Sequence, residues 1–248
     1  MTVEQIEGRN PVREALRAGG KLNKIVIARG SERGLKDIIS MANAADILVE
    51  RQERNWLDAR SRTNAHQGVM AWRPPVEYVA LSELIAAALA KSPDPLVVVL
   101  DGIQDPHNFG SVLRTAEAAG AAGVIIPKHR ACGITPAVAK VSAGALEYVP
   151  VAQVTNLARS IAELKDAGFW VAGADMGGEN LYFEVDLTGP IALVIGGEGK
   201  GLARLTKARC DFLVQLPMLG QINSLNAAVA GAILMYEAVR QRVSTGSR

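Results

Sequence analysis

The sequence contains few of the residues that hold metals or covalent cross-links. Only two of its 248 residues are cysteines, Cys132 and Cys210, and only three are histidines. The cysteines stand far apart, and His66, His107 and His129 have no partner at ligand spacing, so we predict no metal site. Scarce cysteine also favours a reducing compartment, and we expect a cytoplasmic protein.

Long apolar runs and hydrolase motifs are missing as well. The longest strongly apolar stretch, 227–236, is too short to cross a bilayer, and we expect no membrane partner. The N-terminus lacks the basic-then-apolar pattern of a signal peptide. No Gly-x-Ser-x-Gly sequence is present, which argues against a serine hydrolase. A chain that is 49% hydrophobic and 21% charged has a globular composition.

Positive charge is concentrated in the N-terminal third of the chain. Residues 1–75 contain 13 Lys and Arg against 9 Asp and Glu, whereas residues 76–248 contain 14 against 16. A mildly basic module on a near-neutral body is typical of a protein that faces nucleic acid. A solvated surface with chance asymmetry explains the charge numbers equally well.

The pattern of strands and helices predicts two domains. Helix and strand signals alternate up to Pro74-Pro75, and a pair of prolines cannot sit inside a helix. We therefore expect a small α/β domain over 1–73, a linker with one helix over 74–94, and a larger domain over 95–248. Several strands of the larger domain are continuous Val/Ile/Leu runs, which predicts an α/β fold with a mostly parallel sheet covered on both faces.

The first candidate motif is Asn108-x-Gly110-x-x-x-Arg114, directly after an apolar strand. Arg114 is the single arginine of an alanine-rich helix, and Gly110 leaves space beside it on the same helical face. A purely structural interpretation also fits the sequence. Asn108 would then cap the helix, and Arg114 would form an ion pair with Glu117 on the surface.

The second motif is the glycine-rich "IGGEGKGL" over 195–202, which also follows a strand. Glycines allow a backbone to approach a ligand closely. The stretch is not a Walker A loop, because Gly201 stands where Ser or Thr is required. A plain turn is the alternative, but Glu198 in its middle favours a ligand loop.

The third motif, "LPMLGQINSLNAAVAGAILMYEAV", covers 216–239. Its loop leads to Ser224, a candidate N-cap, and then to a helix that is apolar nearly all round. Such a helix favours burial on every side, and its small residues permit close approach of another helix. We therefore expect a homodimer through this C-terminal helix. Ser224 and Asn226 are the polar groups at its start, and capping alone would explain them.

These three motifs, in this order and at strand ends, resemble those of the SpoU (TrmH) family of RNA ribose 2′-O-methyltransferases. The likeness covers nearly the whole chain. "EGRNPVREAL" and "HQGVMA" resemble the small N-terminal RNA-recognition domain of the bacterial branch that methylates a guanosine of 23S ribosomal RNA. The resemblance implies a trefoil-knotted methyltransferase domain, although knots are otherwise nearly absent from proteins. It also implies S-adenosylmethionine as cofactor, RNA as substrate and a dimer, with no metal.

The resemblance also assigns site residues. Backbone groups of the second and third motifs would hold the cofactor; these positions are Gly196, Leu216 and Leu225, with Gly197 and Met218 adjacent. The residues expected to be catalytic are Arg114, Asn108, Glu198, Ser224 and Asn226. Arg114 would stabilise the ribose oxyanion, because a guanidinium stays protonated and is a poor literal base.

The remaining catalytic residues would act around Arg114. Asn108 would orient the hydroxyl or a phosphate, and Glu198 would position Asn108 or Arg114, or favour the cationic cofactor. Ser224 and Asn226 would complete the substrate side.

Three other functions remain open at this point. A tRNA could be the substrate in place of ribosomal RNA. A non-catalytic RNA-binding module would keep the basic N-terminal domain, but it would tolerate loss of Arg114 or Glu198, and both are present. A nucleotide-dependent oxidoreductase would need a glycine-rich turn after its first strand and an acidic residue about 20 residues further on.

Overall fold

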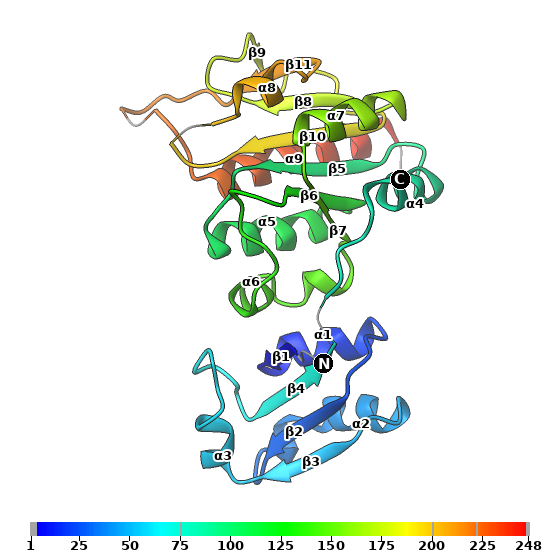
Figure 1. The fold of residues 1–248 in the computed structure, drawn as a ribbon, viewed down its shortest axis with the longest axis vertical. Helices are drawn as coiled ribbons and strands as arrows, with labels where there is room; N and C mark the ends of the chain where they lie inside the picture. The colour runs from blue at the N-terminus through cyan, green and yellow to red at the C-terminus, as the bar shows by residue number, and fades with distance from the viewer. Residues whose placement is uncertain (1–3, 75, 200, 222, 247–248) are drawn as a thin grey trace. The chain divides into compact units, whose positions relative to one another are not determined.

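Figure 1 shows the computed structural model of the chain, which describes residues 4–74, 76–199, 201–221 and 223–246. The chain divides into two compact units. The first consists of Met1–Glu77 and Ile134–Tyr148, and the second of Tyr78–Gly133 and Val149–Arg248.

The first unit is built on a four-stranded sheet with the order β1-β4-β2-β3. One face of this sheet carries the larger apolar core, formed with helices α1 and α2, and the other face packs against the short helix α3. Alternation along β2 explains the two cores, since Ile25 and Ile27 belong to the first and Val26 to the second. The elements are β1 (Glu4–Glu7), α1 (Arg9–Arg17), β2 (Lys24–Ala28), the 3-10 turn η1 (Glu32–Gly34), α2 (Lys36–Ala44), β3 (Val49–Gln52), α3 (Arg54–Asp58) and β4 (Val69–Arg73).

The start of α1 differs from the sequence pattern. Pro11 suggests a helix beginning at Asn10-Pro11, but α1 begins at Arg9, and Gly8 is its N-cap residue. Gly8 has a φ of 97°, a backbone conformation that residues other than glycine rarely adopt. The preceding strand β1, which the sequence pattern did not predict, runs directly into this turn.

The segment 134–148 joins the first unit although it lies far along the sequence. It forms α6 (Pro136–Val141) and the 3-10 turn η2 (Ala145–Glu147). Arg73 at the end of β4 pairs with the carboxylates of both Glu4 and Glu147, with side chains less than 12% exposed. Burial raises the pKa of Glu147, although the charge of Arg73 opposes the increase. The Tyr148 hydroxyl donates to Oε2 of Glu14 at 2.9 Å.

The second unit contains a seven-stranded sheet with the order β7-β6-β5-β10-β8-β11-β9, and every strand pairing in it is parallel. From β5 the chain adds strands on one side, then returns to build the other side from β8 to β11. The elements are α4 (Leu81–Lys91), β5 (Leu96–Asp101), α5 (Pro106–Ala118), β6 (Gly123–Pro127), β7 (Val151–Val154), α7 (Leu157–Asp166), β8 (Trp170–Ala174), β9 (Asn180–Leu181), β10 (Ile191–Gly196), α8 (Arg204–Lys207), β11 (Phe212–Gln215) and α9 (Ala227–Thr245).

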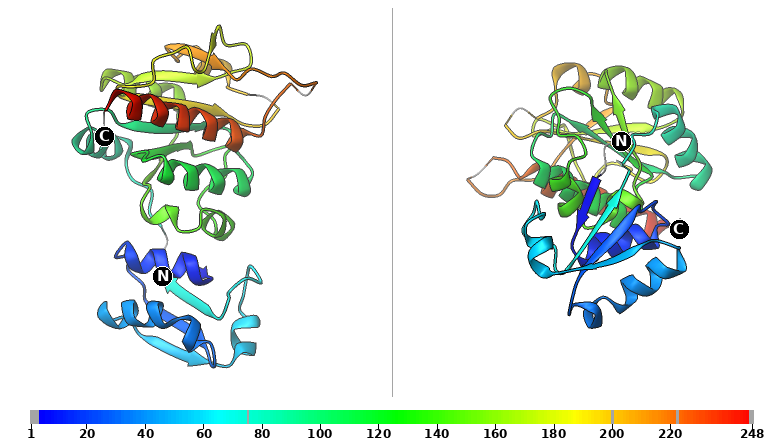
Figure 2. Two further views of the ribbon diagram at one scale, coloured as in Figure 1. Left: turned by 180° about the vertical axis from the view of Figure 1, so that it is seen from behind. Right: turned by 60° about the horizontal axis from the view of Figure 1, so that its bottom comes forward.

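Helices cover both faces of this sheet. Helices α4 and α7 pack on one face, where they bury Val97 and Val99 of β5. Helices α5 and α9 lie side by side on the other face, as the two views of the sheet show (Figures 1 and 2). Gly231 lets α9 pack closely on β10, because a Cβ there would lie 2.6 Å from Cδ1 of Ile195.

The expected α/β class with a mostly parallel, doubly covered sheet is confirmed. The sequence pattern suggests a helix that starts near Leu202, but α8 begins only at Arg204 and is short. Within the described residues, no helix is long and apolar enough to span a bilayer. The trefoil knot implied by the resemblance stays a prediction.

Candidate active site

The three sequence motifs meet at one edge of the second unit's sheet. Strands β5, β8, β10 and β11 are parallel and neighbouring, so their carboxyl ends lie together. Gly196 at the end of β10 is in register with Asp101 at the end of β5. This is also where the strand order changes direction, and open α/β sheets bind ligands at such a point.

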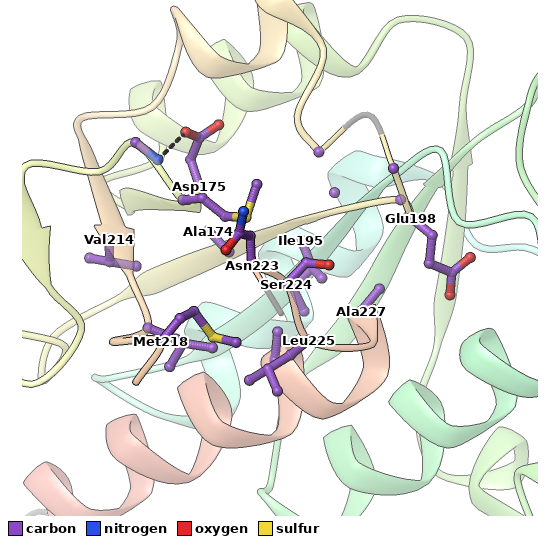
Figure 3. Close-up of a pocket in the computed structure, with 18 residues that line it drawn as sticks. Ala174, Asp175, Ile195, Glu198, Val214, Met218, Asn223, Ser224, Leu225 and Ala227 are labelled. Carbon is purple, nitrogen blue, oxygen red and sulfur yellow. Dashed lines mark hydrogen bonds between the residues drawn. The ribbon is translucent and has the colours of Figure 1, made fainter. Parts of the chain in front are cut away.

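A cavity of about 400 Å³ lies at this edge (Figure 3). Its walls come from the ends of β8, β10 and β11 and from the loop before α9. The lining residues are Ala174, Asp175, Met176, Gly177, Ile195, Gly196, Gly197, Glu198, Gly199, Gly201, Val214, Leu216, Met218, Asn223, Ser224, Leu225, Ala227 and Ala230. All five positions expected to bind cofactor are among them.

The glycine-rich motif folds back on itself beside the cavity. The N–H of Gly197 donates to the Asp101 carbonyl at 2.9 Å, and Gly201 donates to the Gly197 carbonyl at 3.1 Å. A Cβ on Gly196 would lie 2.3 Å from the backbone of Gly201, and one on Gly197 would lie 2.4 Å from the carbonyl oxygen of Gly102. Both glycines are therefore required by close backbone packing, which leaves this wall of the cavity without side chains.

Three polar side chains from the three motifs form one hydrogen-bonded chain. Asn226 donates from Nδ2 to Oδ1 of Asn108 at 2.8 Å, and Nδ2 of Asn108 donates to Oε1 of Glu198. Asn226 is itself held by α9, since its Oδ1 accepts the N–H groups of Ala228 and Val229. Asn108 is buried, and this network fixes its amide orientation.

Two helix starts differ from the sequence expectation. The N-cap of α5 is Asp105, whose carboxylate accepts the N–H of His107, so Asn108 lies inside the first turn and is free to join the network. The N-cap of α9 is Asn226 and not Ser224. Ser224 is exposed and lines the cavity.

Arg114 is an exposed cation on α5, six residues beyond Asn108. Its side chain has no hydrogen-bond or ion-pair partner among the residues the structure describes, and no ion pair joins it to Glu117. The alternative interpretation of Arg114, a surface ion pair with Glu117, is therefore wrong. Arg114 is also not one of the residues that line the cavity.

Helix α9 is only partly buried, contrary to the expectation of burial on every side. Gly231 packs on β10, while Ala227 and Ala230 line the cavity, so the small residues serve the sheet and the site. The opposite side leaves a row of exposed apolar residues. They are Val229, Tyr236 and Val243, which are 48%, 50% and 55% exposed.

Asp175, at the end of β8, is a cavity residue that the motifs did not reveal. Its Oδ1 accepts the N–H of Gly177 at 2.9 Å and Nζ of Lys207 at 2.9 Å. Burial alone would raise the pKa of Asp175, but these two donors outweigh it and lower the pKa below its usual value. The side chain is therefore an ionised carboxylate at neutral pH. The only signal in the sequence is its place directly after a strand.

Two protein-family models match the chain. The model described as the SpoU rRNA Methylase family matches residues 95–236, more than half of the chain. This chain belongs to the SpoU family. A second model, described as RNA 2′-O ribose methyltransferase substrate binding, matches residues 5–79. The SpoU match contains every site residue expected from the sequence.

Relatives and solved structures agree with the SpoU assignment. The chain is 45% identical over 244 residues to YacO of Bacillus subtilis, named as a TrmH family tRNA/rRNA methyltransferase, with 98% of both chains covered. It is similar to the SpoU methyltransferase AviRb of Streptomyces viridochromogenes in complex with AdoMet, with 28% identity, a TM-score of 0.79, and 98% and 91% of the chains covered. A structure described as an RNA 2′-O ribose methyltransferase is 30% identical, with a TM-score of 0.77 and coverage of 97% and 89%.

The SpoU motifs therefore converge in space, but with one gap. Glu198 and Ser224 border the cavity, while Asn108 and Asn226 are joined to Glu198 by hydrogen bonds. Arg114 stands apart on the solvent side of α5. Within the described residues, no group of three or more His, Cys, Asp or Glu side chains is arranged to hold a metal ion.

Proposed function

We propose that this SpoU family member transfers a methyl group from S-adenosylmethionine to a ribose 2′-hydroxyl of RNA, and that its target is a guanosine of 23S ribosomal RNA. The observation that carries the proposal is the hydrogen-bonded chain from Asn226 through Asn108 to Glu198. It joins all three family motifs beside a cavity at the ligand edge of a parallel sheet. Family membership and the substrate-binding match support RNA as the substrate.

The cavity suits S-adenosylmethionine in size and chemistry. About 400 Å³ lies within the usual range for small-molecule sites, which are mostly apolar with a few placed polar groups. Leu216, Met218 and Leu225 provide apolar contact for an adenine ring, and the glycine wall offers backbone groups. When bound, the cofactor supplies an electrophilic methyl group on a sulfonium ion.

Arg114 would stabilise the oxyanion of the attacking ribose hydroxyl. A ribose hydroxyl is a weak nucleophile, and a fixed positive charge favours its deprotonated form in the transition state. A guanidinium that already had a carboxylate partner would be partly neutralised, whereas Arg114 has none among the described residues. Its planar fork can also bind a neighbouring phosphate through two hydrogen bonds.

Asn108 would orient the substrate, and Glu198 would hold Asn108 in place. Both ends of the Asn108 amide are engaged, by Asn226 and by Glu198, so the side chain is preorganised before RNA arrives. Ser224, exposed at the cavity, would complete the substrate side.

We further propose that the protein acts as a homodimer through α9. Val229, Tyr236 and Val243 are seven residues apart, so they form one row along the helix. Apolar rows with this spacing are the ones that pack against a second helix. An exposed apolar row of this kind favours an interaction surface.

Methyl transfer to defined RNAs tests the activity and the substrate. The full-length protein is incubated with methyl-labelled S-adenosylmethionine and either 23S ribosomal RNA, 16S ribosomal RNA or tRNA from cells that lack the gene. We expect label on one guanosine of 23S RNA, at its ribose by mass spectrometry, and no label when that nucleotide is replaced by a 2′-deoxynucleotide. Label only in tRNA would establish the alternative substrate, and no label in any RNA would contradict the activity.

A further inference from the structure

Two carboxylates line the cavity, and they differ in whether an oxygen is left to accept a hydrogen bond from a ligand. Figure 3 shows Asp175 and Glu198 toward opposite sides of the cavity. Glu198 is engaged by the amide of Asn108 and so belongs to the substrate-orienting network. Asp175 comes from β8, a strand that carries none of the three family motifs.

One oxygen of Asp175 carries all of its protein contacts. Oδ1 accepts both the Gly177 N–H and the Lys207 ammonium, whereas no described residue donates a hydrogen bond to Oδ2. The side chain is 17% exposed, so it is neither fully solvated nor sealed in the core. A carboxylate oxygen to which no protein group donates is left to water or to a ligand, so Oδ2 is the acceptor that Asp175 still offers at the cavity.

We propose that Oδ2 of Asp175 accepts a hydrogen bond from a ribose hydroxyl of the bound adenosyl cofactor. The inference rests on the proposed function, because it takes the cavity to be the cofactor site. A carboxylate at the carboxyl end of a parallel strand is a suitable acceptor for a ribose hydroxyl. Asp175 is then a binding residue and takes no part in methyl transfer.

Lys207 bears on which donor of such a cofactor Oδ2 would accept. The cofactor offers neutral donors, which are the ribose hydroxyls and the adenine amino group, and a positively charged α-ammonium group. Lys207 lies 2.9 Å from Oδ1, so a second ammonium at Oδ2 would meet a like charge close by. A neutral hydroxyl meets no such repulsion. The arrangement therefore disfavours the amino-acid tail, and ligands that lack one ribose hydroxyl separate the ribose from the adenine.

The substitution Asp175→Asn tests this contact. Asparagine keeps Oδ1, which holds the Gly177 turn, and replaces Oδ2 by an NH₂ group that cannot accept a hydrogen bond. Asp166→Asn is the matched control, because Asp166 is exposed in the same unit and does not line the cavity. Thermal unfolding of both full-length variants confirms that they are folded.

Calorimetry with two ligands identifies the partner group. S-adenosylhomocysteine has both the ribose and the amino-acid tail, whereas 5′-methylthioadenosine has the ribose but lacks the tail. We expect Asp175→Asn to weaken both ligands equally, by about tenfold to a hundredfold, the usual effect of losing a hydrogen bond to a charged group. The control variant should bind both ligands as the unaltered protein does.

The possible outcomes separate this inference from the proposed function. A loss confined to S-adenosylhomocysteine would assign Asp175 to the amino-acid tail, and no loss with either ligand would make it a structural residue; both overturn the inference alone. Failure of the unaltered protein to bind S-adenosylhomocysteine would overturn the proposed cofactor site and the inference together. As a second check, the 2′-deoxy or the 3′-deoxy form of methylthioadenosine should bind the unaltered protein more weakly than methylthioadenosine does, and Asp175→Asn should not weaken its binding further.

Discussion

Single residues at the site show which roles a sequence pattern can and cannot assign. Asn108, Glu198 and Asn226 were found from their motifs, and the structure joins them by hydrogen bonds. Helix capping was misassigned, because Asn and Asp are equally good caps and only the backbone shows that Asp105 is used. Asp175 was missed because a lone carboxylate after a strand has no partner at a recognisable spacing.

Replacement of Arg114 tests the proposed oxyanion role. Arg114→Ala should reduce single-turnover methyl transfer to ribosomal RNA by about 10²–10³, the usual cost of one preorganised electrostatic donor. Cofactor affinity by calorimetry should stay unchanged, because Arg114 does not line the cavity. Arg114→Lys keeps the charge but loses the planar fork, and should restore activity only in part.

The control for this prediction is Arg209→Ala, which removes another exposed arginine from the same unit. It should leave turnover unchanged. Turnover near that of the unaltered protein in Arg114→Ala would instead make Arg114 an ordinary surface residue.

At the level of elements, helix α9 shows how an apolar pattern misleads. Its sequence is apolar nearly all round, which predicts burial on every side. In the structure, one side packs on β10 and α5, and the exposed row Val229, Tyr236 and Val243 faces solvent. Periodicity identifies apolar positions but not what covers them, because a sheet, a neighbouring helix and a second protein all favour the same residues.

A charge placed in the middle of this row should separate the proposed dimer. Tyr236→Glu would bury an unpaired carboxylate in the interface, which is strongly unfavourable. We expect the mass from light scattering at micromolar concentration to fall from about twice the 26.3 kDa chain mass to that of one chain. Ser244→Glu, also exposed but off the row, should leave the mass of the unaltered protein unchanged. A 26.3 kDa mass for the unaltered protein would rule out the dimer itself.

Across the whole molecule, the sequence indicated the fold class and the basic character of the N-terminal part. The structure shows which of these positive side chains have no carboxylate partner. A surface hollow of about 380 Å³ in the first unit is lined by the cations Arg33, Lys36 and Arg51, together with one acidic residue, Glu32, and the uncharged Ile39, Ser40 and Asn43. Among the residues described, none of the three has a carboxylate partner. Tertiary structure brings these three side chains together, so the sequence alone shows only the total charge of the segment.

Neutralising these three cations should lower the affinity for RNA and make that affinity less sensitive to salt concentration. Each phosphate contact contributes about 0.7 to 0.9 to the slope of log affinity against log salt. A triple replacement of Arg33, Lys36 and Arg51 by Gln should therefore lower the slope for a 23S RNA fragment by about 2, measured by fluorescence anisotropy at several salt concentrations. Cofactor affinity should not change.

The matched control removes three cations of the same unit that already have carboxylate partners. They are Arg13, Arg17 and Arg29. Their replacement by Gln should change the slope much less. Equal effects of the two triple variants would mean that the general charge of the unit, and not the hollow, binds RNA.

The segment 134–148 also bears on how this chain could exchange parts with a relative. It lies inside the part of the chain matched by the SpoU methylase model, yet it packs with Met1–Glu77, where Glu147 pairs with Arg73. The first unit therefore does not correspond to one continuous stretch of the gene. Recombination that exchanged only the N-terminal third would join a new substrate-binding unit to an old 134–148 segment. Viable exchanges must carry both pieces together, or be followed by compensating changes where the two meet.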